Sequence, residues 1–250
     1  MVRARNLIAA AQVDWKPPAQ PWIMRQTWRE LLFAHWPLPI AAFTDRLPPG
    51  LALDTFDGQA WIGLVPFVMS GVRPRDLPPV AGLSRFAELN VRTYVTRDGK
   101  PGVWFYSLDA SNPIAVAIAR AVYHLDYFNA RFRIAHQGKA IHYHATRTDD
   151  RIAPAEFDLT YAPIGAVFHA VPGTLAHWLT ERYALYAADA RGHLYRGEIR
   201  HPAWPLQLAS ATIHTNTLAS SHGFTLPDTP PLLYYAHKQE MVAWNIARLT

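Results

Sequence analysis

The side chains best suited to chemistry lie within one stretch of this chain, residues 85–128. A carboxyl group can give or take a proton, and a guanidinium group can hold a carboxylate through two parallel hydrogen bonds. The stretch contains both kinds of group, together with amide and phenol side chains that form hydrogen bonds. These candidates are Glu88, Asn90, Arg92, Asp109, Arg120 and Tyr127. Such residue types suit the binding of a small organic acid and a proton transfer to or from it.

Asp98-Gly99 separates two segments rich in Val, Tyr, Phe, Thr and Trp, and this pattern predicts a β-hairpin with a two-residue turn. Such a turn fixes the register, so that Arg92 faces Phe105 and Glu88 faces Asp109. One face of the hairpin is then apolar, and the other gathers the charged and amide side chains. Two carboxylates directly opposite each other are unfavourable unless they share a proton or meet a cation. The polar face is therefore either solvated surface or a polar site.

An unusually apolar helix is expected after the hairpin. Residues 111–113 supply an N-cap and a proline for the first turn, and residues 114–122 are apolar on all sides apart from Arg120. We therefore expect this helix to be buried on most sides. Its guanidinium needs an anionic partner, because a buried unpaired charge is strongly destabilising. The hypothesis is a pocket in which two arginines meet two carboxylates, and the alternative is a structural ion-pair network. The four residues concerned are Arg92, Arg120, Glu88 and Asp109.

Several phrases of the sequence resemble those of the YqjF-like family of uncharacterised bacterial proteins. They occur in order along most of the chain: LLFAHWP, LDTFDGQAWIGLVPF, FAELNVRTYV, GKPGVWFYSLDA and RHPAWPL. That family is similar to the acetoacetate decarboxylase superfamily, so the resemblance implies a conical antiparallel β-barrel around a ligand cavity. It also implies that Glu88 corresponds to the strand glutamate of the decarboxylases and Arg120 to their helix arginine.

The sequence departs from the decarboxylase pattern at the two lysines. With Arg120 aligned, those lysines fall at about Tyr127 and Phe128, and neither side chain can form a Schiff base. The lysines of this chain lie elsewhere, at Lys16, Lys100, Lys139 and Lys238. The decarboxylase mechanism requires a lysine amine with a lowered pKa. We therefore predict no acetoacetate decarboxylase activity, and we expect Tyr127 to donate a hydrogen bond where the lysine would lie.

The composition is that of one globular domain. Of 250 residues, 50% are hydrophobic and 17% are charged, which suits a sizeable core within residues 1–250. Residues 1–21 are basic and then proline-rich, which predicts a loose arm. The formal charge of +5 is spread without a Lys/Arg run, so we expect no nucleic-acid partner. There is no cysteine, and no run of about 18 apolar residues that would span a membrane. These features lead us to expect a cytoplasmic protein.

The histidines of one expected hairpin are the candidates for a metal site. His142 and His144 lie two apart on one expected strand face, with His136 close by, and an HxH pair is a possible metal-ligand set. Solvated strand histidines explain the pattern better, so we predict no metal. Motifs for nucleotides, serine hydrolysis and zincin proteolysis do not occur in the sequence, and we predict no cofactor. The proline-containing loop 71–84 is either a lid or a plain surface connection.

The expected fold is mainly β with a few helices. Strands are expected over 28–36, 51–55, 59–69, 130–134, 140–146, 156–161, 183–188, 193–199, 206–217 and 232–249, besides the central hairpin. Helices are expected at 39–47 and 174–183 as well as 114–122.

The predicted function is the binding of a small keto or hydroxy acid, with Glu88 as a general acid or base whose pKa is raised by burial and by Asp109. Two alternatives are a non-catalytic binding or sensing protein and a barrel filled by side chains that serves assembly. The sequence does not identify the ligand or the oligomeric state, and it is compatible with a homo-oligomer.

Overall fold

The computed structural model describes residues 6–8, 16–80, 82 and 84–250, and strands dominate it, which confirms the mainly β prediction. The strands are β1 Met24–Leu38, β2 Ala52–Leu53, β3 Ala60–Pro74, β4 Arg85–Arg97, β5 Lys100–Ala110, β6 Tyr127–Gln137, β7 Ala140–Arg147, β8 Glu156–Phe168, β9 Ala184–Ala188, β10 Leu194–Arg200, β11 Leu206–Asn216, β12 Leu232–Ala243 and β13 Ala247–Arg248. The helices are η1 Ile40–Phe43, α2 Pro113–Tyr123, α3 Leu175–Thr180 and α4 Leu218–Ser221.

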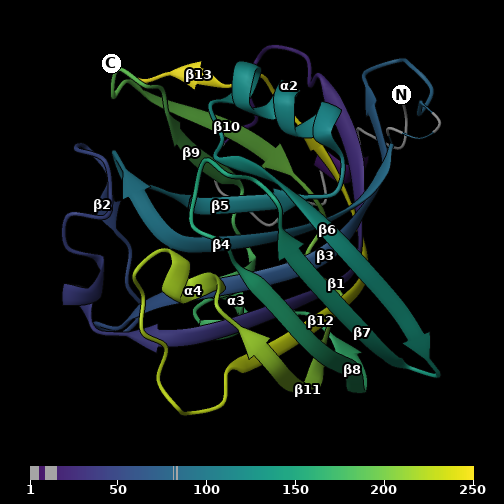
Figure 1. Cartoon of the computed structure of the whole chain (residues 1–250). Coiled ribbons are helices and arrows are strands. Elements are labelled where there is room, and N and C mark those ends of the chain that lie inside the picture. Colours follow the sequence, from purple (N-terminus) through teal and green to yellow (C-terminus); the bar gives the residue numbers. More distant parts are fainter. Residues whose placement is uncertain (1–5, 9–15, 81, 83) are drawn as a thin grey trace.

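The strands close into two rings that share one wall (Figure 1). The shared wall consists of β12, β1, β3, β4 and β5, in that order. One ring closes through β6, β7, β8 and β11, and the other closes through β9 and β10, which pairs with β12. The expected antiparallel arrangement holds except where β5 pairs in parallel with β6 and with β9. Since α2 connects β5 to β6, that parallel pairing is the product of a helical crossover.

Side chains on the shared wall alternate between two separate cores. On β4, Leu89 and Val91 face a core that also includes Tyr143 and Leu159, so it lies inside the ring closed by β7 and β8. Phe86 points the other way, into a second core formed with α2 and α3. Because neighbouring strand residues point to opposite faces, one wall serves both rings. The second core is the one that surrounds a cavity.

The β4–β5 hairpin has the predicted register near its turn and a different register beyond it. Arg92 faces Phe105 as expected, but a β-bulge then shifts the pairing, so that Leu89 faces Asp109 and Glu88 faces Ala110. The predicted pairing of the two carboxylates was wrong. A bulge adds one residue to one strand and reverses the side to which the following side chains point. Asp109 consequently points toward the filled core, away from Glu88.

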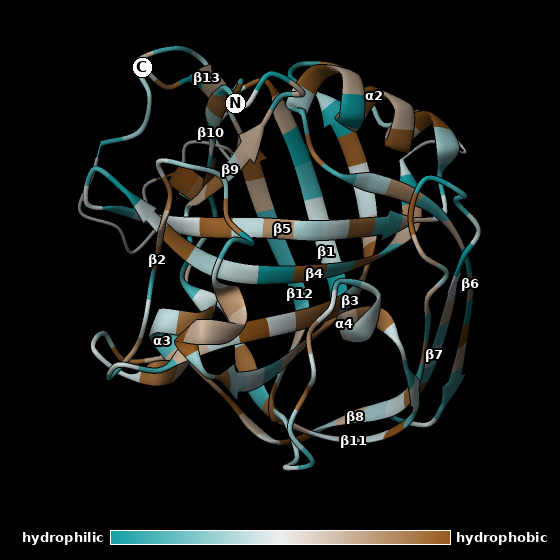
Figure 2. Cartoon of the chain, turned by 60° about the vertical axis from the view of Figure 1, so that its left-hand side comes forward, coloured by the Kyte–Doolittle hydropathy of each residue, from teal (hydrophilic) through white to brown (hydrophobic). Residues whose placement is uncertain are grey.

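Helix α2 begins as expected. The Asn112 side chain accepts hydrogen bonds from the backbone N–H groups of Ile114 and Ala115 in the first turn. The expectation that it would be buried on most sides was wrong. Ile114, Ile118 and Val122 are each about half exposed, whereas Val116 is buried. Figure 2 shows the helix on the outside of the molecule, with hydrophobic residues along it. The helix buries Val116 in the second core, while the half-exposed Ile114 and Ile118 also border the cavity.

Most other expected elements occur, with differences at their ends. The first expected strand continues through Pro37, and the short helix α4 was not predicted. Residues 1–5 and 9–15 of the expected loose arm lie outside the described residues, but Leu7 is buried against Val242 and Trp244. Among the described residues, no helix is both long and apolar enough to cross a membrane.

Candidate functional site

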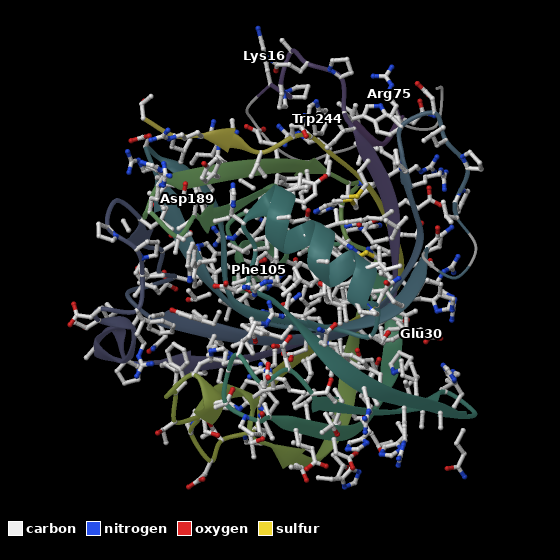
Figure 3. The ribbon with its side chains drawn as sticks, turned by 45° about the horizontal axis from the view of Figure 1, so that its top comes forward. Lys16, Glu30, Arg75, Phe105, Asp189 and Trp244 are labelled. Atoms are coloured by element: carbon white, nitrogen blue, oxygen red, sulfur yellow. The ribbon has the colours of Figure 1, made fainter. Side chains whose placement is uncertain are left out.

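A cavity of about 570 Å³ lies in the second ring. Its walls come from the shared strands, from α2 and from β9 and β10, and most of the lining side chains are apolar. Phe105 and Trp244, two aromatic residues of this lining, are labelled in Figure 3. The loop predicted over 71–84 is shorter than expected, because β3 continues to Pro74; from this stretch Val72 of β3, Val80 and Ser84 border the cavity. A mostly apolar cavity of several hundred Å³ with a few polar groups is typical of small-molecule sites.

Strand β4 carries a row of polar side chains into this cavity. Glu88, Asn90 and Arg92 all line it, because residues two apart on a strand point to the same side. At roughly 3.3 Å per residue, the backbones of Glu88 and Arg92 lie about 13 Å apart. The row therefore has a carboxyl end and a guanidinium end, with an amide between them.

The carboxyl end is a hydrogen-bonded pair. The Tyr127 hydroxyl donates to Glu88 Oε2 at 2.9 Å, and both side chains are buried. Burial is the largest cause that raises the pKa of Glu88 from its ordinary value of 4.5 to about 8. The nearby negative charge of Asp109 raises it further, while hydrogen bonds with Tyr127 and Asn90 lower it. Glu88 is thus mainly protonated at pH 7 and can donate a proton inside the cavity.

The guanidinium end contains a second arginine that the sequence reasoning missed. Arg182 donates from Nη1 to Asp54 at 2.6 Å and from Nε to the Trp178 carbonyl at 2.7 Å. Arg92 donates from Nη2 to the Leu179 carbonyl at 3.3 Å. Each guanidinium keeps one buried nitrogen, Nε of Arg92 and Nη2 of Arg182, with no hydrogen-bond partner in the described part of the chain. Arg182 lies within the helix predicted over 174–183 but beyond the end of α3 at Thr180, and only its position beside Arg92 gives it significance.

Several further buried polar atoms of the cavity wall lack partners within the described residues. Besides the two arginine nitrogens, they are Trp28 Nε1, Ser84 Oγ, Asn90 Oδ1 and Trp204 Nε1. Buried polar groups in folded proteins are nearly always hydrogen-bonded, and an unsatisfied one costs about 1–3 kcal/mol. Their concentration around one cavity makes this cavity the candidate functional site of the chain.

Asp109 lies outside this cavity. It forms a buried bidentate ion pair with Arg147, with Nε to Oδ1 at 2.6 Å and Nη2 to Oδ2 at 2.7 Å. The Arg147 and Asp109 side chains are only 1% and 3% exposed. Ser107 joins the pair by accepting a hydrogen bond from Arg147 at 3.0 Å. The predicted convergence of Asp109 with Arg92 and Arg120 was wrong, because the bulge points Asp109 to the other face of β5.

Arg120 also lies apart from the predicted cluster. Its guanidinium is half-buried, donates to the Tyr127 carbonyl at 3.1 Å and lies over the Phe128 ring. It is not among the described residues that line the cavity. The helix turns Arg120 toward β6, while Ala115 and Ala119 face the cavity.

All four lysines belong to the described part of the chain, and none of them lines the cavity. Lys100 pairs with Glu198 at 2.5 Å. His142 and His144 each pair with a carboxylate of β8, at 2.7 Å and 2.9 Å. The described residues contain no group of three side chains that could hold a metal ion.

Comparisons with known proteins agree with this architecture. A family model described as "Uncharacterized conserved protein" (DUF2071) matches residues 25–240. The chain is 47% identical over 227 residues to the uncharacterized protein YqjF of Bacillus subtilis (strain 168). The aligned region covers 91% of this chain and 93% of that protein. The resemblance noted in the sequence is confirmed.

Solved structures with a similar fold have low sequence identity. The enduracididine biosynthesis enzyme MppR with HEPES bound has a TM-score of 0.65 at 11% identity, covering 94% of this chain and 89% of that one. MppR has also been solved with pyruvate. Acetoacetate decarboxylase from Legionella pneumophila has a TM-score of 0.61 at 11% identity, covering 98% and 95% of the two chains. These likenesses show an acetoacetate-decarboxylase-like fold.

Proposed function

The chain belongs to the DUF2071 family of uncharacterized conserved proteins, and we propose that it binds a small organic acid in the cavity. Glu88 and Tyr127 would carry acid–base chemistry there without a lysine. The observation that carries the proposal is the pair of guanidinium groups, Arg92 and Arg182, that line a mostly apolar cavity and each keep one buried nitrogen without a partner among the described residues. The ligand of MppR, pyruvate, is itself a small organic acid.

The two arginines support recognition of a carboxylate. A guanidinium donates along parallel N–H bonds that match the geometry of a carboxylate. Arg182 already has Asp54 as a partner, whereas Arg92 makes no ion pair with any described residue. A ligand carboxylate beside Arg92 would supply the missing charge in a setting where water screens it little.

The size and lining of the cavity favour an acid with an apolar body over pyruvate itself. The space is about 570 Å³ and its wall is mostly aliphatic and aromatic. With its carboxylate at Arg92, a ligand must extend past Asn90 for its other end to reach Glu88. Each methylene that leaves water contributes about 0.8 kcal/mol, so longer chains should bind more tightly.

The acid–base role rests on Glu88 being protonated at neutral pH. In this state it can give its proton to a carbonyl or enolate oxygen of the bound acid, and the Tyr127 hydroxyl can then stabilise the carboxylate that forms. A Schiff base is not part of the proposal, because the lysines lie away from the cavity.

Binding can be tested by calorimetry with pyruvate and 2-oxooctanoate. We expect 2-oxooctanoate to bind at least about tenfold more tightly, since five added methylenes enter apolar surroundings. Arg92→Gln should weaken its binding by about tenfold or more, because a charge-assisted hydrogen bond is lost. Arg120→Gln is the matched control and should leave the affinity unchanged. Equal losses in the two variants would contradict the assignment.

The absence of a Schiff base can be tested by borohydride reduction in the presence of 2-oxooctanoate. The intact mass should stay that of the free protein, while an acetoacetate decarboxylase treated in parallel with acetoacetate gains a reduced adduct. A one-to-one adduct on this chain would contradict the lysine-independent proposal.

Catalysis can be separated from binding alone by following deuterium exchange next to the keto group of 2-oxooctanoate in D₂O. The proposal predicts acid-assisted enolisation, in which Glu88 gives its proton to the keto oxygen while a water molecule takes the proton from the adjacent carbon. The resulting exchange should be abolished in Glu88→Gln while the ligand still binds. Binding with no exchange in the unaltered protein would favour the non-catalytic binding or sensing function instead.

A further inference from the structure

A second concave site lies on the other face of the shared wall, across β12, β1, β3 and β4, and is called here the basic groove. Its volume is about 360 Å³. Five of its lining side chains are cationic and one is a carboxylate; the full lining is Arg25, Thr27, Arg29, Ser70, Gly71, Arg73, Arg85, Lys238 and Glu240. The groove thus gathers an excess of positive charge close to the formal net charge of +5 of the whole chain.

The register of the sheet places cations directly opposite cations. Arg29 faces Lys238 across β1 and β12, and Arg25 faces Arg73 across β1 and β3. Like charges directly opposite each other in antiparallel strands are destabilising. Two such pairs close together destabilise the folded protein unless an anion lies between the cations. The register therefore indicates that this face binds an anion.

The chain neutralises only part of this charge. The Glu240 carboxylate pairs with Arg25 and, at 2.8 Å, with Lys238. Arg29 instead donates to the Ser70 hydroxyl at 2.9 Å, and Arg73 donates to the Gly71 carbonyl at 3.1 Å. Arg29, Arg73 and Arg85 make no ion pair with any residue in the described ranges, so three guanidiniums keep their charge uncompensated.

The groove is separate from the cavity. Gln26 and Trp28 line the cavity, whereas Arg25, Thr27 and Arg29 alternate with them and point to the opposite face. Arg73, at the end of β3, is the residue that borders both spaces. A ligand in the groove therefore meets a polar, cationic surface and none of the apolar lining of the cavity.

We propose that the basic groove binds a soluble phosphate-bearing anion with at least two negative charges. Guanidinium groups bind phosphate oxygens bidentately, and the Thr27 and Ser70 hydroxyls can add hydrogen bonds. The space of about 360 Å³, lined by nine residues, suits a small group such as a pyrophosphate. The proposal is independent of the organic-acid function of the cavity.

The test is calorimetric titration of the full chain with inorganic pyrophosphate at low ionic strength. We expect one-to-one binding that weakens as salt rises toward about 0.15 M, where charges are screened within roughly 8 Å. Arg29→Gln and Arg85→Gln should each lower the affinity by about fivefold or more, because each removes one charged donor. Arg133→Gln, which removes an exposed cation of β6, is the matched control and should leave the affinity unchanged.

Three results would overturn the proposal: no binding of pyrophosphate, an equal loss of affinity in Arg133→Gln, or binding that occurs only with phosphatidylcholine vesicles containing phosphatidic acid. The last result would assign the groove to a lipid headgroup. Arg92→Gln should keep its pyrophosphate affinity, so failure at the groove and failure at the cavity are distinguishable.

Discussion

Replacing Asp109 with Asn is expected to lower the free energy of unfolding by about 3–5 kcal/mol, the usual effect of removing one partner of a buried ion pair. The Arg147 guanidinium would stay buried without its carboxylate, at 1% side-chain exposure. Urea unfolding of the two proteins at neutral pH measures the difference. Below its transition, the variant should still bind 2-oxooctanoate, because Asp109 is not part of the cavity wall.

Two further variants make this prediction specific. Asp76→Asn makes the same chemical change in an ion pair whose carboxylate is 69% exposed, so it should cost less than about 1 kcal/mol. The double variant Asp109→Leu with Arg147→Met should recover much of the loss, since apolar replacement of a whole buried pair is often neutral. An unchanged stability of Asp109→Asn would show that the pair is not held as the structure has it.

The contrast between Asp109 and Glu88 shows what local sequence patterns can and cannot predict. The Asp98-Gly99 turn and the register beside it follow from turn chemistry over a few residues. Beyond that point the bulge turns Asp109 toward Arg147, which lies 38 residues further along the chain. The partner that satisfies Asp109 is therefore outside the hairpin, and no pattern within the hairpin reveals the shift.

The same limit applies to the arginines. Strand alternation predicts that Arg92 belongs to the site, and Arg92 lines the cavity. The prediction for Arg120 depends on an apolar helix being buried, but α2 is half exposed along Ile114, Ile118 and Val122, and Arg120 lies beside β6. Arg182 lies in the site because it comes just before β9, and the pairing of β9 with β5 brings these distant segments together. Helix burial and strand order are tertiary properties, and neither follows from periodicity alone.

Glu88 is tolerated in the cavity because it can remain neutral. Glu88 is a residue of β4, and the next residue, Leu89, is fully buried in the core of the other ring. An ionised carboxylate at this position would need a cation, and none of the described arginines forms an ion pair with it. The fold therefore carries a penalty that grows with pH. Residues with perturbed pKa values in cavities are candidates for function, and this penalty can be measured directly.

Glu88→Gln is expected to gain stability relative to the unaltered protein as pH rises. The pKa of Glu88 is about 8 when folded and near its ordinary value of 4.5 when unfolded. Between these values the folded state binds the extra proton, so stability falls by about 1.4 kcal/mol for each pH unit, and Gln escapes this loss. The advantage of the variant should grow by about 3.5 kcal/mol from pH 5 to pH 8 and level off at higher pH.

Urea unfolding of both proteins at about pH 5, 6, 7 and 8 measures this slope. Asp228→Asn is the control, because Asp228 is exposed in the loop before β12 and its carboxylate stays in water on folding. Its difference from the unaltered protein should stay nearly constant with pH. A constant difference for Glu88→Gln as well would mean that Glu88 ionises as easily in the cavity as in water. In that case the carboxyl group could not serve as the proton donor at neutral pH, and the acid–base part of the proposed function would fail while carboxylate binding at Arg92 would stand.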